Sequence, residues 1–279
     1  MRGDEFPRSL VVFAPSPVLT ITVEARSDGG SDIHLHAGGQ GFWVARMAVS
    51  LGTEVRLCCA LGGETGKVLR TLIVNELYGI TVASGLDADV TLLCGVQPKQ
   101  ILDADVYRRL AGDLRVNGRT VIADLTGAPL VAALAGGLTV LKLSHEELLA
   151  EGRTASDEVR DLLEGMRKLS RAGAESVLLS RGPAPALVLD GEHEPPRFLE
   201  LSGPRFEAAD PTGSGDSMFA ALGVGLAAGS GLVDALKVAV AAGALNATRR
   251  GLGTGTRDEI QRLSRHVDAH PLAESGLGD

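Results

Sequence analysis

Residues 209–217 read Ala-Asp-Pro-Thr-Gly-Ser-Gly-Asp-Ser and stand directly before an apolar run that we expect to form a helix from Asp216 to Ala228. The small residues Gly213, Ser214 and Gly215 leave backbone N–H groups free to approach a ligand at the mouth of that helix. Unpaired amides and the helix dipole favour an anion there. Asp216, at the end of the run, could then act as a base beside a transferring phosphoryl group. A first-turn acid favoured only by the dipole would give the same pattern, so this stretch alone leaves both interpretations open.

On either side of this stretch, short apolar strands alternate with helices. Such alternation predicts an α/β fold with a doubly wound, mostly parallel sheet flanked by helices, whose ligands bind beyond the carboxyl ends of the strands. We expect one domain over residues 1–279, with a small β-flap at approximately 19–36. The predicted strands are 10–14, 55–61, 90–94, 120–123, 138–143 and 176–179, with an antiparallel meander of 187–189 and 197–201 at the sheet edge. The predicted helices are 42–51, 65–78, 104–116, two that start at His145 and Ser156, and two apolar ones at 216–228 and 232–248.

The composition is that of a folded protein, with 44% hydrophobic and 22% charged residues and a net charge of −8. This acidic balance offers no basic surface to nucleic acid, and the apolar stretch 219–233 is too short to span a membrane. The first ten residues lack the apolar segment of a signal peptide, so we expect a cytoplasmic protein that binds neither nucleic acid nor membrane. Cys58, Cys59 and Cys94 fit no disulfide framework or zinc pattern, and we expect them to be buried small apolar residues.

Residues 210–216 resemble the Asp-Thr-x-Gly-Ala-Gly-Asp signature of the PfkB, or ribokinase-like, carbohydrate kinases. Residues 38–46, Gly-Gly-Gln-Gly-Phe-Trp-Val-Ala-Arg, are similar to that family's Gly-Gly-Lys-Gly-x-Asn-Val-Ala-Arg run, and residues 61–66 to its Leu-Gly-Gly-x-x-Gly turn. Residues 141–148 resemble its Lys-Pro-Asn-x-x-Glu-Leu segment, and residues 180–182 its Ser-x-Gly turn. The likeness covers nearly the whole chain and is closest to the branch that phosphorylates fructose 1-phosphate and tagatose 6-phosphate.

The resemblance implies a ribokinase-like sheet with a reduced β-flap, or lid. It also implies transfer of the γ-phosphoryl group of ATP, with Mg²⁺, to a hydroxyl of a sugar, sugar phosphate or related small molecule. Asp216 would be the base, and the amides of Gly213, Ser214 and Gly215 would hold the developing charge. The residues implied for the nucleotide and its Mg²⁺ are Lys142, Glu147, Ser180, Gly182, Asp210, Thr212 and Asn246. Those implied for the acceptor are Thr20, Gly38, Gly39, Gln40 and Trp43, with no residue assigned as a direct metal ligand.

The acceptor side departs from the family pattern at several positions. An acidic residue that grips sugar hydroxyls is Thr20 here, the lysine is Gln40, and an asparagine is Trp43. A cation for a sugar phosphate is thereby lost and a flat apolar surface gained. The short passage from Gly79 to Val90 leaves no room for the family's lid strands and Thr-Arg pair. These changes favour the alternative of a catalytically silent ribokinase-like protein that binds a nucleotide or a metabolite.

Weaker candidates lie elsewhere in the chain. His34 and His36 alternate on an expected strand and could face an acceptor or a metal, although two histidines without a third ligand are more often surface residues. Trp43 could stack on a ring of the acceptor or fill the space left by the short lid. Arg249 and Arg250 could meet a nucleotide phosphate or simply favour a helix end. By analogy with the family, we expect either a monomer or a homodimer formed through residues 19–36.

Overall fold

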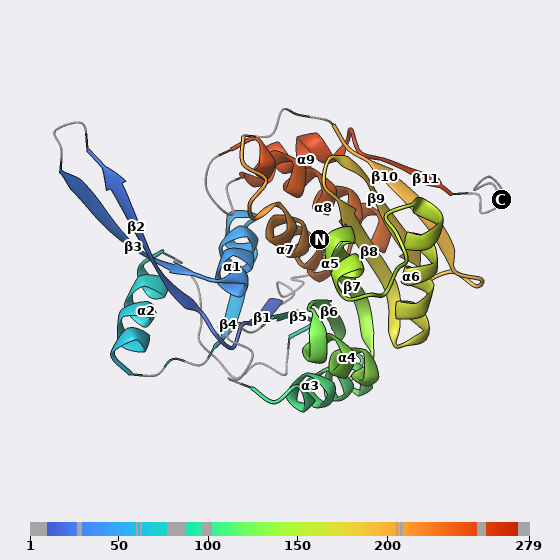
Figure 1. The fold of residues 1–279 in the computed structure, drawn as a ribbon, viewed down its shortest axis with the longest axis horizontal. Helices are drawn as coiled ribbons and strands as arrows, with labels where there is room; N and C mark the ends of the chain where they lie inside the picture. Colours follow the sequence, from blue (N-terminus) through green and yellow to red (C-terminus); the bar gives the residue numbers. More distant parts are fainter. Residues whose placement is uncertain are drawn as a thin grey trace, which may run out of the picture.

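The computed structural model describes residues 10–26, 30–59, 61, 63–76, 88–95, 102–204, 206, 209–249 and 255–272. Within them, nine strands form a central sheet in the order β11-β10-β9-β8-β7-β6-β5-β1-β4 (Figure 1). The strands that pair in parallel are β4 (Val55–Cys58), β1 (Leu10–Phe13), β5 (Val90–Cys94), β6 (Thr120–Asp124), β7 (Leu138–Ser144) and β8 (Ala174–Arg181). The antiparallel edge consists of β9 (Ala184–Asp190), β10 (Arg197–Ser202) and β11 (Asp268–Pro271).

Helices cover both faces of this sheet, which is why its central strands are continuous apolar runs. In β5, Leu92 belongs to one apolar core and its neighbour Leu93 to the other, because successive side chains of a strand point to opposite faces. The first core includes residues of α1 (Gln40–Ser50), α2 (Gly63–Glu76), α7 (Ser214–Ala227), α8 (Leu232–Ala247) and α9 (Arg257–Ser264). The second includes residues of α3 (Asp105–Val116), α4 (Gly127–Gly136), α5 (His145–Ala150) and α6 (Val159–Arg171).

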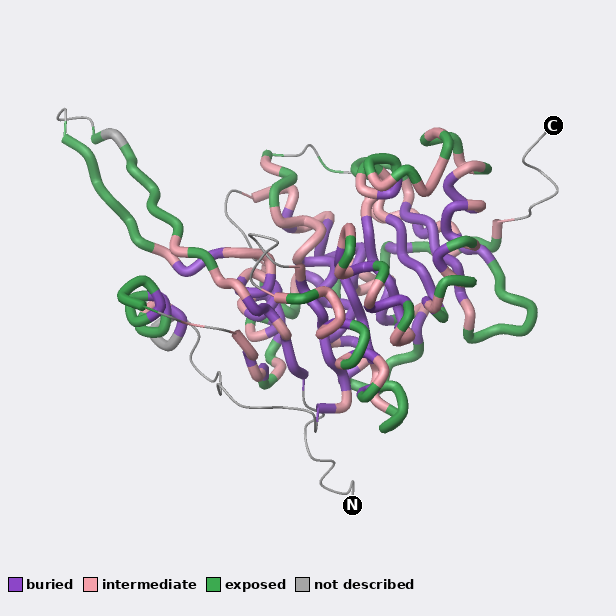
Figure 2. The backbone as a smooth tube through the Cα atoms, turned by 60° about the horizontal axis from the view of Figure 1, so that its bottom comes forward, coloured by how far each residue is buried: buried purple, intermediate pink, exposed green. Residues whose placement is uncertain are grey.

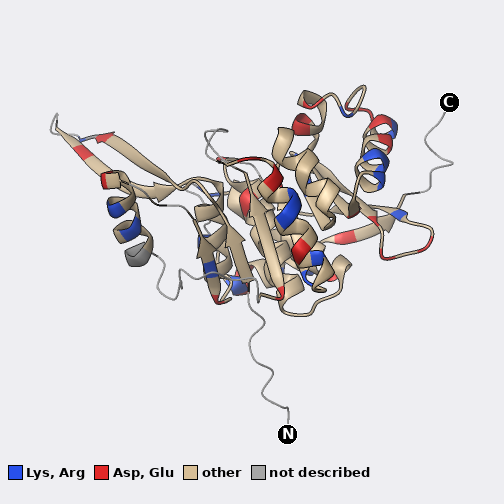
Figure 3. Cartoon of the chain, turned by 90° about the horizontal axis from the view of Figure 1, so that it is seen from below, with Lys and Arg blue, Asp and Glu red and all other residues tan. Residues whose placement is uncertain are grey.

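The charged residues are distributed unevenly over the helices and strands of these layers. The charged side chains lie mainly on the peripheral helices and strands, whereas α7 and α8 are almost free of them (Figure 3). Nearly uncharged helices of this kind are expected where both sides of the helix meet other protein. Among the described residues, no helix is both long and apolar enough to cross a membrane.

A two-stranded antiparallel hairpin, β2 (Val18–Ala25) and β3 (Ser31–Gly38), projects away from the sheet (Figures 1 and 2). Its register pairs Val18 with Gly38 and Ala25 with Ser31, and most of its residues are exposed. The predicted class is therefore confirmed: a doubly wound, mostly parallel α/β sheet with a small lid-like β-flap.

Several details differ from the sequence-based expectation. Helix α4, helix α9 and strand β11 were not predicted; α4 is so uniformly apolar and small-residue-rich that it has no polar face for a helical period to reveal. Strand β4 ends at Cys58, before the predicted Leu61. The expectation of buried cysteines is wrong for Cys58 and Cys59, which are half-buried, and right for Cys94. Cys58 ends β4, the edge strand of the sheet, and Cys59 follows it, so both lie at the margin of the fold. The predicted gap between Gly79 and Val90 lies almost entirely outside the described residues.

Candidate active site

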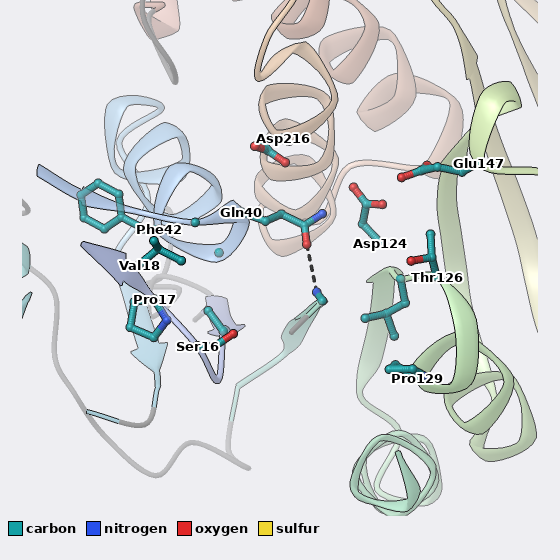
Figure 4. Close-up of a pocket in the computed structure, with 15 residues that line it drawn as sticks. Ser16, Pro17, Val18, Gln40, Phe42, Asp124, Thr126, Pro129, Glu147 and Asp216 are labelled. Atoms are coloured by element: carbon teal, nitrogen blue, oxygen red, sulfur yellow. Dashed lines mark hydrogen bonds between the residues drawn. The ribbon is translucent and has the colours of Figure 1, made fainter. Parts of the chain in front are cut away.

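A cavity of about 310 Å³ opens where the carboxyl ends of β5 and β6 meet the amino-terminal ends of α1 and α7 (Figure 4). The carboxyl ends of parallel strands are where doubly wound sheets bind their ligands. Three carboxylates, those of Asp124, Glu147 and Asp216, line the cavity. The remaining lining residues are Ala14, Ser16, Pro17, Val18, Gly39, Gln40, Gly41, Phe42, Gly95, Leu125, Thr126 and Pro129.

Asp216 lies in the first turn of α7 and is held there by a short, ordered loop. Thr212 N–H donates to Asp210 Oδ1 over 2.9 Å, and Ser214 N–H donates to the carbonyl oxygen of Pro211 over 3.1 Å. Gly213 then adopts a φ of 77°, a left-handed conformation that glycine accepts without strain. The Ser214 amide is thus engaged within the turn, whereas the first N–H groups of a helix have no acceptor inside it.

Burial, together with the nearby carboxylates of Asp124 and Glu147, raises the pKa of Asp216 to about 7, although the ammonium of Lys142 opposes the shift. A carboxylate ordinarily titrates near 4. A group that titrates near neutrality can both take up and release a proton at physiological pH. The local environment therefore allows the Asp216 carboxyl to exchange its proton near neutral pH.

Asp124 and Lys142 form a buried ion pair behind this group. Asp124 ends β6 and Lys142 lies on β7, with 2.7 Å between Asp124 Oδ2 and Lys142 Nζ and only 4% and 6% of the side chains exposed. Burial lowers the pKa of Lys142, but the carboxylates of Asp124, Glu147 and Asp216 together raise it above its usual range, so the ammonium stays charged. A Cβ on Gly215 would lie 2.9 Å from Lys142 Nζ, so a residue without a side chain lets α7 approach the ammonium this closely.

Glu147 is fixed by the start of α5. The Ser144 hydroxyl accepts a hydrogen bond from Glu147 N–H over 3.2 Å, and Ser144 N–H donates to Glu147 Oε2 over 2.7 Å. This reciprocal capping box orients the Glu147 carboxylate at the cavity wall.

The opposite side of the cavity is uncharged. Gln40, the first residue of α1, accepts a hydrogen bond from Gly95 N–H through Oε1 over 2.9 Å, and its side chain also bonds Asp124. Ser16, Pro17 and Val18 follow β1 and lie on the far side from the carboxylates (Figure 4). This half of the cavity therefore offers neutral polar and apolar groups.

Some of the predicted site residues line or adjoin the cavity, and others lie away from it. Asp216, Glu147, Gly39 and Gln40 line the cavity, and Lys142 and Gly215 adjoin it through the contacts given above. Asn246 on α8 donates from Nδ2 to the carbonyl oxygen of Thr212 over 2.8 Å. This contact ties the 210–216 loop to α8.

Other predicted residues do not line the cavity. Thr20 is exposed on β2, and its hydroxyl lies against Gly38. Trp43 packs edge-to-face on Phe42 with ring centres 5.0 Å apart and lies under the guanidinium of Arg46. Ser180 ends β8, and Gly182 forms the turn into β9.

The weaker candidates also have places in the fold. His34 and His36 stack on the hairpin with ring centres 6.0 Å apart, and the described part of the chain holds no group of three or more potential metal ligands. Arg249 pairs with Glu259 over 2.6 Å, and Arg250 lies outside the described residues.

Sequence reasoning did not single out Asp124. The available signal was its position: a carboxylate at the carboxyl end of a buried parallel strand, where ligands of doubly wound sheets bind. Its ion pair with Lys142 joins two strands and could only be seen once β6 and β7 lay side by side.

Solved structures place the chain in the ribokinase-like fold. Phosphofructokinase-2 from Escherichia coli in complex with potassium aligns with a TM-score of 0.78, 21% sequence identity and coverage of 92% of this chain and 98% of that one. Ribokinase from Arabidopsis thaliana complexed with ribose and ATP aligns with a TM-score of 0.75, 17% identity and coverage of 93% and 99%. At these identities the likeness concerns the fold alone.

Sequence comparison defines the family. The model of the pfkB family carbohydrate kinases matches residues 87–259. ATP-dependent 6-phosphofructokinase isozyme 2 of Escherichia coli (strain K12) is 25% identical over 274 residues, which span 82% of this chain and 87% of the relative. The isozyme 2 of Mycobacterium tuberculosis (strain H37Rv) is 32% identical over 161 residues, or 57% and 46% of the two chains. The chain belongs to the pfkB family of carbohydrate kinases, phosphotransferases with an alcohol group as acceptor, as the resemblance predicted.

Proposed function

We propose that this protein transfers the γ-phosphoryl group of ATP to a hydroxyl of a carbohydrate or a related small molecule, with Asp216 as the general base. One observation carries the proposal. A carboxylate with a pKa near 7 stands in the first turn of α7, in a cavity whose far side is uncharged and suited to a hydroxyl-bearing ligand.

In this reaction the groups in and beside the cavity have different roles. Asp216 takes the proton of the acceptor hydroxyl as that oxygen attacks phosphorus. The Gly213 and Gly215 amides at the start of α7 and the dipole of that helix hold negative charge on the transferring group, whereas the Ser214 amide, also predicted for this role, already donates to the carbonyl oxygen of Pro211. Lys142 adds a fixed positive charge beneath Gly215, where it counters the same charge.

The donor groups also suit a magnesium ion carried by ATP. Mg²⁺ prefers carboxylate, water and phosphate oxygens, and Asp124 and Glu147 present carboxylates to a cavity whose described lining holds neither lysine nor arginine. When bound, the ion would neutralise charge on the phosphate oxygens. Asp210, Thr212, Asn246, Ser180 and Gly182 complete the proposed nucleotide side.

The decisive experiment compares wild type with Asp216→Asn for ADP release in the presence of Mg²⁺, ATP and a panel of sugars, sugar phosphates and nucleosides. Asp216→Asn is expected to lose at least about 100-fold in kcat, the usual contribution of a positioned base. Asp234→Asn is the matched control, because Asp234 is an exposed first-turn acid of α8 remote from the cavity lining. Turnover that survives Asp216→Asn as well as it survives Asp234→Asn would contradict the assignment.

A catalytically silent binding protein is the second candidate. It is favoured by the acceptor residues, since Thr20 and Trp43 do not line the cavity and Gln40 is committed to Gly95 and Asp124. Calorimetry separates the two functions. Binding of Mg²⁺·ATP without acceptor-dependent ADP release on the panel would support the silent protein.

We also propose that residues 1–279 form one domain with the β2–β3 hairpin as its lid, and that two copies associate through that hairpin. One face of the hairpin presents Ile21, Val23, Ile33 and Leu35, which are 47–68% exposed. Helix α2 contacts both strands of the hairpin, yet these four side chains stay exposed. An exposed apolar face of this kind favours association, so a second copy is the natural cover. The cytoplasmic location and the absence of a nucleic-acid partner stay predictions.

A further inference from the structure

The cavity divides sharply by charge. Every ionisable side chain that lines it in the described part of the chain is acidic: Asp124, Glu147 and Asp216. The lining residues around the start of α1 and after β1 are all uncharged, from Ser16 to Val18 and from Gly39 to Phe42. We infer that the phosphoryl acceptor is a carbohydrate or polyol that carries no phosphate group of its own. This inference rests on the proposed kinase function and narrows its substrate class.

A phosphorylated acceptor would need a cation or free amides to hold its phosphate. The ammonium adjoining the cavity, that of Lys142, is 2.7 Å from Asp124 and lies beneath Gly215, on the side of the transferring phosphoryl group. The Lys142 ammonium is therefore already paired with Asp124 and placed for the transferring phosphoryl group. Among the described residues, a second dianion on the acceptor side would face three carboxylates without this charge to balance it.

The start of α1 does not replace the missing cation. Phe42 N–H and Trp43 N–H both donate to the carbonyl oxygen of Gly39, over 3.0 and 3.2 Å, so these amides are used within the turn. Arg46, one turn further along α1, stands over the Trp43 ring with 5.7 Å between the guanidinium carbon and the ring centre. These two amides are therefore not free to bind an acceptor phosphate at the start of α1.

Gln40 helps to keep the acceptor side of the cavity uncharged. Its amide accepts from Gly95 N–H and bonds Asp124, so it joins the end of β5 to the end of β6 while adding no charge. A lysine at this position would place an ammonium on the acceptor side of the cavity.

The test uses matched acceptor pairs that differ only in a phosphate group: fructose with fructose 6-phosphate, tagatose with tagatose 6-phosphate, and ribose with ribose 5-phosphate. The inference expects kcat/KM at least about 100-fold higher for the uncharged member of the best pair, a discrimination that one unbalanced buried charge can supply. Gln40→Lys should shift that ratio by about tenfold or more toward the phosphorylated member. Gln40→Met, which removes the amide without adding charge, should lower activity on both members without reversing the preference.

Outcomes for the inference and for the kinase function are separable. Preference for the phosphorylated member, lost in Asp216→Asn, would overturn the inference and leave the proposed function intact. If no acceptor is turned over, the proposed function fails, and calorimetry with the same pairs in the presence of a non-hydrolysable ATP analogue decides the inference. Binding of uncharged sugars would still support it, whereas binding of sugar phosphates alone, or of no member of any pair, would overturn it.

Discussion

At the scale of single residues, Asp216 owes its proposed role to its surroundings. Burial and two neighbouring carboxylates raise its pKa to about 7, and a base must be deprotonated to accept a proton. We therefore expect kcat/KM to rise with pH, to reach half its plateau near pH 7, and to fall about tenfold for each pH unit below that. A pH–rate profile measured with saturating Mg²⁺·ATP checks this, and a profile flat from pH 5.5 to 8.5 would contradict it.

The Asp124–Lys142 pair makes a second prediction at this scale. Lys142→Met leaves the buried Asp124 carboxylate without its partner, which typically costs about 3–5 kcal/mol of unfolding free energy. The double variant Asp124→Asn with Lys142→Met removes both charges and should recover much of that loss. Denaturant unfolding of the two variants measures the difference.

An exposed ion pair supplies the control. Lys67 and Glu64 lie 2.9 Å apart with 74% and 90% of their side chains exposed, and such pairs contribute at most about 1 kcal/mol. If Lys142→Met destabilises the protein no more than Lys67→Met does, the buried pair does not hold the ends of β6 and β7 together.

At the scale of elements, the β2–β3 hairpin makes the clearest prediction. Its two faces differ: Ile21 and Ile33 lie on the apolar face, whereas Thr22 points to the opposite face. We expect a concentration-dependent dimer for the wild type, a monomer for Ile33→Glu, and an unchanged dimer for Thr22→Glu. Sedimentation velocity distinguishes these states. A wild type that stays monomeric at all concentrations, or dissociation by both variants alike, would contradict the proposed interface.

The elements also show which patterns sequence can reveal. Strand β5 and helices α7 and α8 were predicted because apolar runs bounded by turn residues are strong local signals. Helix α4 was missed because its residues are apolar or small on every side, and β11 because its four residues, Asp-Ala-His-Pro, carry no strand pattern of their own. Strand β11 exists because β10 offers an open edge for pairing.

At the scale of the whole molecule, the acidic charge makes the nucleotide depend on its metal. The net charge is −8, and three carboxylates line the cavity, so ATP without a cation would be repelled. We expect Mg²⁺·ATP at 100 times its Kd to stabilise the fold by about 2.7 kcal/mol, or roughly 5–10 °C in Tm. ATP with EDTA should give a small fraction of this shift, and MgCl₂ alone none. Equal stabilisation with and without Mg²⁺ would contradict a metal-dependent nucleotide site.

Some features of this protein follow from local sequence patterns, whereas others depend on contacts that form only in the folded chain. The sequence by itself determined the sheet class, the flap, the family and the helix predicted from Asp216, which begins at Ser214 in the structure. Each of these depends on short patterns of polarity and small residues. Only the tertiary structure decided that Lys142 pairs with Asp124, that Gln40 joins Gly95 to Asp124, and that Thr20 and Trp43 do not line the cavity. These contacts join residues as distant in the sequence as Gln40 and Asp124. Burial and nearby charges change the pKa of Asp216 only after the chain has folded and brought these groups together.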